Sequence, residues 1–130
     1  MNGKLAEPSN WEEINKTKNF AFSGAKNISY WIGLSDLGHE GTFKWASSNI
    51  TLAEITDWNY GQPDNWKGIE HCVVIRKSYG YKWNDQSCSS PTYGLCQMKK
   101  FKYFISNVNL NFDEASNVRG HSNNTCQFFG

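Results

Sequence analysis

Five side chains with oxygen donors are concentrated around one polar stretch of the sequence. They are Gln62, Asp64, Glu70, Asn84 and Asp85. Three of them are carboxylates, which repel one another at close range unless a cation lies between them. Ca²⁺ is a hard cation that takes six to eight oxygen ligands, so five protein side chains leave places for water or for two neighbouring sugar hydroxyls. These residue types therefore predict a calcium site with room for a ligand.

The elements around these donors must bring them together. The stretch 46–70 mixes Ser, Asn, Thr, Asp, Gly and Pro, and a loop of this length in a small domain is usually functional. Asn84 and Asp85 end a predicted strand that would hold them against this loop. A cis bond before Pro63 would turn Gln62 and Asp64 the same way, at a cost of about 0.5–1 kcal/mol. The alternative is an ordinary turn with solvated polar side chains.

Periodicity and turn residues predict an α+β fold with two helices and short, mostly antiparallel strands. The first helix is expected over 9–23, because Ser9 and Glu12 form a capping box and Gly24 is a suitable stop. A second helix is expected to begin at Asn111 and to end near Gly120. Strands are expected at 30–34, 41–45, 72–75, 81–84, 93–97 and 101–105.

Length and charge exclude several classes of protein. The 130 residues suffice for one compact domain, 1–130, and a net charge of +1 gives no reason to expect nucleic acid as a partner. No apolar run approaches the roughly 20 residues that cross a bilayer, so membrane insertion is not expected. The first residues also lack the apolar stretch of a signal peptide.

Four cysteines predict two disulfides, and they are Cys72, Cys88, Cys96 and Cys126. No two of them form a C-x-x-C pair and the three histidines lack finger spacing, so these spacings do not predict a zinc site. Four N-x-[ST] sequons accompany them, at Asn15, Asn27, Asn49 and Asn123. Oxidised cysteines and sequons together indicate a secreted, extracellular protein.

Four motifs make the chain resemble a C-type lectin-like carbohydrate-recognition domain. Trp31–Leu34 is similar to the family's WIGL strand, and Gln62–Asp64 to its sugar-selecting tripeptide. Glu70–Val73 is similar to its acid-x-Cys-Val element, and Trp83–Asp85 to its WND element. The resemblance covers about 3–96 in the family's order. It implies that the five oxygen donors bind Ca²⁺ and, through the ion, the vicinal hydroxyls of a sugar.

The resemblance also implies which sugar is bound. In this family Gln-Pro-Asp accompanies galactose selectivity, and Glu-Pro-Asn accompanies mannose selectivity. An aromatic side chain stacks on galactose at the position of Trp66, while Trp58 and Tyr60 are expected to fill the loop. The sugar is expected to contact Gln62, Asp64, Trp66, Glu70 and Asn84.

Two further features of the family are expected in this chain. The resemblance implies disulfides Cys72–Cys88 and Cys96–Cys126. An auxiliary calcium site is expected to use three residues, which are Asp36, Glu40 and Asn65. His71 stands where the family often has Asp, and an imidazole is a poor calcium ligand, which counts against that site.

The order of the segments suggests a circular permutation. Residues 1–96 form the body, whereas 97–130 resemble the family's opening: 102–105 its first strand, and 111–115 the start of its first helix. The old ends would join near Met98, and new ends would lie between Gly130 and Gly3. Residues 119–123 look inserted, and a rival hypothesis makes 101–130 the start of a second, truncated domain. Peptide mapping distinguishes them, because an unpaired Cys126 contradicts permutation.

The expected function is calcium-dependent binding of glycans that end in galactose or N-acetylgalactosamine. The alternative is a structural or protein-interaction member of the same fold, such as a mineral-matrix protein. An enzyme is not expected, because no Cys–His or G-x-S-x-G arrangement supplies a nucleophile. The sequence leaves homo-oligomerisation open.

Overall fold

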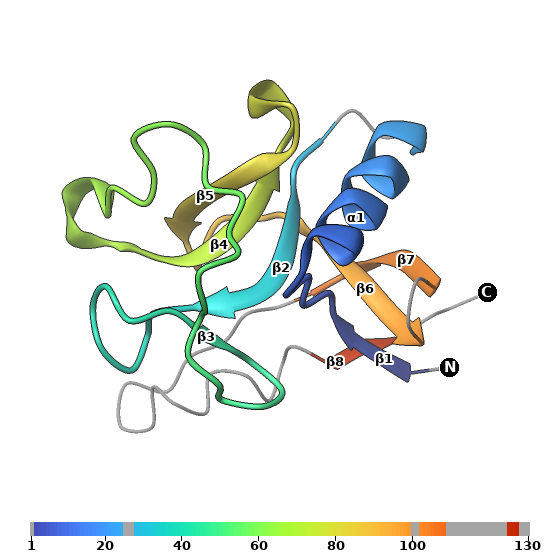
Figure 1. Cartoon of the computed structure of the whole chain (residues 1–130), viewed down its shortest axis with the longest axis horizontal. Helices are drawn as coiled ribbons and strands as arrows, with labels where there is room; N and C mark the ends of the chain where they lie inside the picture. The colour runs from blue at the N-terminus through green and yellow to red at the C-terminus, as the bar shows by residue number, and fades with distance from the viewer. Residues whose placement is uncertain (1, 25–27, 100–101, 109–124, 128–130) are drawn as a thin grey trace.

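A computed structural model describes residues 2–24, 28–99, 102–108 and 125–127 (Figure 1). Its described part is α+β and holds one α-helix, α1 (Trp11–Ser23). The expected second helix from Asn111 lies outside the described residues, so the fold as described has one helix and not two. The strands are β1 (Asn2–Leu5), β2 (Tyr30–Ser35), β3 (Lys44–Trp45), β4 (Glu70–Arg76), β5 (Lys82–Ser87), β6 (Tyr93–Lys99), β7 (Lys102–Asn107) and β8 (Thr125–Gln127).

The described strands form one mixed sheet in the order β5-β4-β2-β6-β1-β8, with β3 paired to β2 and β7 paired to β6. The β2–β6 pair is parallel and the other pairs are antiparallel. Short β1 and β8 were not predicted by pattern, because pairing with distant strands defines them: Leu5 lies opposite Cys96, and Gly3 opposite Cys126. The strand expected at 41–45 is shorter, since Gly41 takes a left-handed turn conformation with φ 84°.

Helix α1 begins one residue later than the capping box predicts. The N-cap is Asn10, whose Oδ1 accepts a hydrogen bond from the Glu13 N–H at 2.9 Å. The Glu13 carboxylate accepts in return from Asn10 Nδ2 at 2.9 Å and from the Ser9 N–H at 3.4 Å. The predicted box with Ser9 and Glu12 was therefore wrong by one position, although the reciprocal capping logic holds. Gly24 ends the helix, as the sequence predicts, and it does so in an extended conformation.

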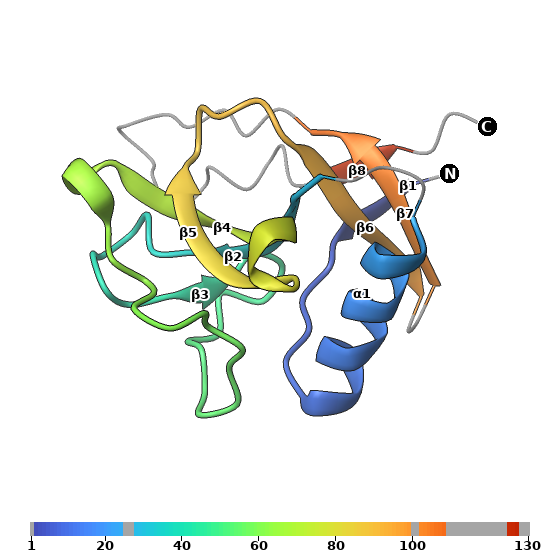
Figure 2. The same ribbon diagram turned by 90° about the horizontal axis from the view of Figure 1, so that it is seen from above.

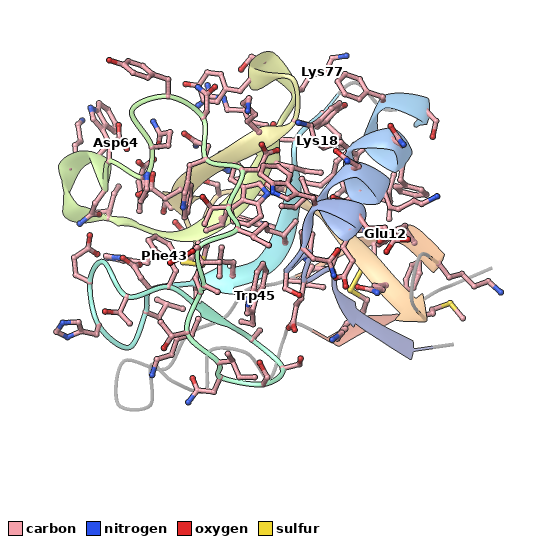
Figure 3. The ribbon with its side chains drawn as sticks, viewed as in Figure 1. Glu12, Lys18, Phe43, Trp45, Asp64 and Lys77 are labelled. Atoms are coloured by element: carbon pink, nitrogen blue, oxygen red, sulfur yellow. A yellow bond between two sulfur atoms is a disulfide. The ribbon has the colours of Figure 1, made fainter. Side chains whose placement is uncertain are left out.

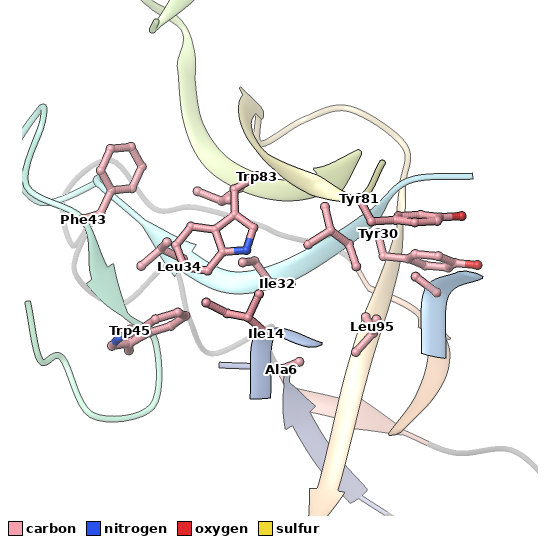
Figure 4. Close-up of a cluster of buried hydrophobic side chains, with 13 residues drawn as sticks. Ala6, Ile14, Tyr30, Ile32, Leu34, Phe43, Trp45, Tyr81, Trp83 and Leu95 are labelled. Carbon is pink, nitrogen blue, oxygen red and sulfur yellow. The ribbon is translucent and has the colours of Figure 1, made fainter. Parts of the chain in front are cut away.

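Aromatic and aliphatic side chains from β2, β3, β5 and neighbouring segments build the core (Figure 4). Trp83 on β5 meets Trp45 edge to face, with ring centroids 6.0 Å apart. Helix α1 contributes Ile14 and packs its Phe20 ring 5.8 Å from Tyr103 on β7. Figures 1 and 2 show α1 beside the β6–β7 part of the sheet. This packing joins β7 to the same core as the rest of the chain.

The long loop after β3 is anchored to β5 through Trp58. Its ring lies 5.5 Å from that of Trp83, and the Asn59 N–H donates to the Trp83 carbonyl at 2.9 Å. Buried Asp57 pairs with Lys18 and Lys82 at 3.1 and 3.2 Å. Tyr60 does not fill the loop as predicted, because 99% of it is exposed.

Two disulfides cross-link the described strands as the resemblance implies. Cys72–Cys88 links β4 to the segment after β5, and Cys96–Cys126 links β6 to β8. Closing loops of this size stabilises a fold by about 3 kcal/mol each. Among the described residues, no helix combines the length and the apolar character that a membrane span requires.

Candidate functional site

Three carboxylates predicted as ligands come together at the end of the molecule that lies away from α1. Oxygens of Asp64, Glu70 and Asp85 all lie within 4.8 Å of one another. Figure 3 shows Asp64 on the loop before the short 3₁₀ turn η1 (Trp66–Gly68). Glu70 opens β4 and Asp85 lies on the adjacent strand β5, so the sheet fixes two of the three groups.

Asp85 holds the loop against the sheet. Its side chain is buried, and its two oxygens accept hydrogen bonds from the N–H groups of Asp64 at 3.1 Å and Asn65 at 2.7 Å. Backbone donors of this kind favour an ionised carboxylate. Burial nonetheless raises the pKa of Asp85, with the charge of Asp64 acting in the same direction. The Asp85 carboxylate is therefore well oriented, but no nearby positive charge compensates its negative charge among the groups that shift its pKa.

The two predicted amide ligands also face this cluster. Asn84 is buried, and its Nδ2 donates to the Asp85 carbonyl at 2.7 Å, which turns its Oδ1 toward Gln62. In the orientation that satisfies its neighbours, the Gln62 amide nitrogen donates to Asp85 Oδ1 at 2.7 Å and to Asn84 Oδ1 at 2.9 Å. The Gln62–Pro63 bond is cis, which is one of the two arrangements that the sequence left open. All five predicted side chains thus converge on one place.

Glu70 shows the electrostatic cost of this convergence. Its Oε1 accepts from the Trp66 N–H at 3.0 Å, which by itself lowers the pKa. Burial together with the neighbouring Asp64 and Asp85 outweighs that bond and raises the pKa of Glu70 from 4.5 to about 7. Without a cation the site therefore tends to keep a proton on Glu70.

The donor set fits calcium on chemical grounds. Four of the converging side chains present carboxylate or amide oxygens as possible metal ligands. The fifth, Gln62, can rotate its amide so that its oxygen, and not its nitrogen, faces the ion. A hard divalent ion prefers such ligands, and its charge would offset the burial and the mutual repulsion that together raise the pKa values of Glu70 and Asp85. Neither sulfur nor imidazole joins this group among the described residues.

Trp66 lies at the rim of the cluster with 59% of its surface exposed. Its backbone N–H donates to Glu70 Oε1 at 3.0 Å, so the backbone at Trp66 is held against the carboxylate cluster. Lys67 Nζ lies 4.4 Å from the centroid of the Trp66 ring. A sugar that stacks on Trp66 must therefore use the other face of the ring or displace this ammonium group.

Two of the three predicted auxiliary ligands lie in a second cluster. Asp36, just after β2, and Glu40 both face His71 on β4. Burial raises the pKa of Asp36 to about 6, and Glu40 contributes to that rise. The third predicted ligand, Asn65, accepts a hydrogen bond from the Glu70 N–H at 3.0 Å. In the sequence, His71 was considered only as the replacement of an acidic calcium ligand. The structure shows that it is a member of this cluster.

The raised pKa of Glu70 predicts how the calcium-free protein responds to pH. Between pH 4.5 and about 7 the folded state keeps a proton on Glu70 that the unfolded state has lost, so stability should fall as pH rises through this window. Asp36 adds a similar fall between 3.8 and about 6. Thermal unfolding in a chelator should therefore show a midpoint that decreases across this range, and saturating calcium should oppose the decrease.

The control for this prediction is Glu70→Gln. The variant should lose the Glu70 part of the slope and keep the Asp36 part. Identical slopes for the variant and the parent chain would show that Glu70 does not titrate in this way.

Comparison with known proteins agrees with the geometry. A sequence profile of the lectin C-type domain matches residues 1–98. The chain belongs to the C-type lectin family. Members of this family are binding domains and not enzymes, in agreement with the sequence-based expectation, and they are often calcium-dependent.

Two relatives show how much of this chain is shared with known proteins. Perlucin from Haliotis laevigata is 36% identical over 104 residues, 79% of this chain and 66% of that protein. Salivary C-type lectin 1 from Aedes albopictus is 39% identical over 74 residues, 54% of this chain and 48% of that protein. The chain thus spans about half to two thirds of the length of these relatives.

Solved lectin structures share the fold. CEL-I from Cucumaria echinata matches with a TM-score of 0.56 and 32% identity, over 64% of this chain and 59% of its own. Human lithostathine matches with a TM-score of 0.63 and 26% identity, over 75% of this chain and 73% of its own. The mixed sheet with α1 beside it is therefore the C-type lectin-like fold.

Proposed function

We propose that this C-type lectin domain binds glycans that end in galactose or N-acetylgalactosamine, and that it does so through calcium. One observation carries the proposal: all five predicted ligands converge at one place beside an exposed Trp66. A calcium ion held there supplies a positive centre for two neighbouring sugar hydroxyls. A structural or protein-binding role alone would not require five oxygen donors to be kept together.

The side chains around the ion would orient the sugar. Asp64 and Glu70 are hydrogen-bond acceptors for hydroxyl protons, and the amide of Gln62 offers both a donor and an acceptor. Galactose and mannose differ in the direction of their neighbouring hydroxyls, so the placement of acid and amide decides which pair fits. With glutamine at 62 and aspartate at 64, the family resemblance supports galactose.

Trp66 supports the same selectivity. One face of galactose is mostly C–H, and an exposed indole offers a flat and weakly polar surface for it. The hydrogen bond from the Trp66 N–H to Glu70 holds the backbone of this residue at the carboxylate cluster. Few sugar atoms are buried in such an arrangement, so a single site should bind weakly and clustered sites strongly.

The test is a calorimetric titration of the chain with galactose, N-acetylgalactosamine and mannose. With calcium we expect binding of the first two at about millimolar strength, and with a chelator no binding of any of them. Acid should weaken binding, because protons compete with calcium for the carboxylates. Preference for mannose would contradict the selectivity, and binding that persists in the chelator would contradict the role of calcium.

The order of the chain supports a second proposal, a circular permutation within one domain of residues 1–130. Strand β7 forms an antiparallel hairpin with β6, where Leu95 lies opposite Ile105. Strand β8 pairs with β1, and Cys126 on β8 is bonded to Cys96. Strands β7 and β8 thus follow β6 in the chain and still pair with the body formed by residues 1–96. Secretion is proposed as well, and the two disulfides support it.

A further inference from the structure

A second cluster of metal-binding side chains lies apart from the five oxygen donors. His71 Nδ1 lies 3.1 Å from Asp36 Oδ1 and 3.2 Å from Glu40 Oε2. These three donor atoms come from the end of β2, the loop after it and strand β4. Together they form one imidazole and two carboxylates around a single point.

This donor set does not fit the auxiliary calcium site that the family resemblance implies. Calcium takes oxygen ligands, and here one of the three donors is an imidazole nitrogen, which faces both carboxylates. Ions such as zinc bind imidazole nitrogen and carboxylate oxygen together, commonly through three protein ligands with one position left open. The replacement of oxygen by nitrogen changes which ion the cluster suits.

The spacing of the donors suits a small ion. Tetrahedral zinc with bonds of about 2.1 Å holds its ligand atoms about 3.4 Å apart. The distances of 3.1 and 3.2 Å from His71 Nδ1 are only slightly shorter. Small outward movements of the side chains would therefore admit the ion.

The surroundings of the cluster fix two of its members and leave the third accessible. The Asp36 side chain is 1% exposed, and its Oδ2 accepts from the Gly41 N–H at 2.9 Å, which leaves Oδ1 for His71. The Asp36 N–H donates to the His71 carbonyl at 3.1 Å, so the two residues are also tied through the backbone. Glu40 is 53% exposed, which gives an ion access from solvent. Partners that orient metal ligands in this way are typical of metal sites.

We propose that Asp36, Glu40 and His71 bind a zinc-class transition-metal ion, separately from the calcium cluster. The sequence-based expectation against zinc rested on the spacing of cysteines and histidines. The fold brings one histidine together with two carboxylates from other segments, and the spacing of cysteines and histidines does not reveal such a combination. The alternative is an ion pair between a protonated His71 and the two carboxylates, with no metal.

The test is calorimetric titration of the calcium-saturated chain with zinc, followed by visible absorption with cobalt in its place. We expect one zinc per chain and a cobalt spectrum of low coordination number. His71→Gln should weaken zinc binding by more than about tenfold, since even the outer partners of metal ligands change affinity by 10–100-fold. His39→Gln and His121→Gln, which alter the other two histidines, should bind zinc as the parent chain does.

Asp64→Asn separates this site from the calcium cluster, and it should leave zinc binding unchanged. Three results would overturn the proposal: no zinc binding, zinc binding that survives His71→Gln, or zinc binding that is lost in Asp64→Asn. The thermal unfolding of each variant without metal shows whether its fold is intact, and Asp36→Asn serves as a second variant if His71→Gln does not fold.

Discussion

Replacing Asp64 by asparagine should abolish calcium-dependent galactose binding and leave the fold intact. The change removes one of the three carboxylates that converge in the cluster. A unit charge about 4 Å away is worth about 4 kcal/mol at an effective dielectric constant of 20, so calcium affinity should fall by at least about a hundredfold. Calcium titration followed by galactose titration measures both losses.

The fold should survive this change, because the Asp64 side chain is exposed. Its backbone N–H donates a hydrogen bond to Asp85, and asparagine keeps that donor. The variant without calcium should unfold at the same temperature as the parent chain or slightly higher, since one repulsive charge is gone. Glu54→Gln is the matched control, an exposed acid of the same loop outside the carboxylate cluster. Full galactose binding by the Asp64 variant would remove this residue from the site.

Exchanging acid and amide on the loop should change which sugar is preferred. The double variant Gln62→Glu with Asp64→Asn keeps one acid and one amide, so the charge around the ion is conserved. Because the hydrogen-bond donor and acceptor change places, we expect the ratio of galactose to mannose affinity to invert by at least about tenfold, or 1.4 kcal/mol. Parallel titrations with both sugars in calcium give this ratio.

Trp66→Ala is the control variant for the predicted change of sugar preference. In the parent chain it should weaken galactose binding, because the stacking surface is lost. In the double variant it should change mannose binding little, because that sugar would not rely on the ring. If the double variant still binds calcium and still prefers galactose, the tripeptide does not select the sugar in this chain.

Sequence patterns located most of the elements because local chemistry defines them. Helix α1 was predicted from polar capping residues and spaced apolar positions, with an error of one residue at its start. The buried strands were predicted from runs such as Cys72–Ile75, now part of β4. The short strands β1 and β8 have no such pattern, since hydrogen bonds to residues far along the chain define them.

The loop also has features that local sequence does not determine. Trp58 and Tyr60 have similar neighbours in sequence, yet Trp58 packs on Trp83 and Tyr60 is exposed. Which of two nearby rings packs against the core depends on the direction of the backbone, and composition does not reveal that direction.

The sequence by itself determined the family, the helix and the kinds of donor that could hold calcium. These follow from motifs and from residue chemistry, which act within a few positions of the chain. Only the tertiary structure decided that Asn84 presents its oxygen to the cluster, and that His71 faces both Asp36 and Glu40. Side-chain direction and the meeting of distant strands depend on strand register and packing, which form only when the whole sheet is assembled.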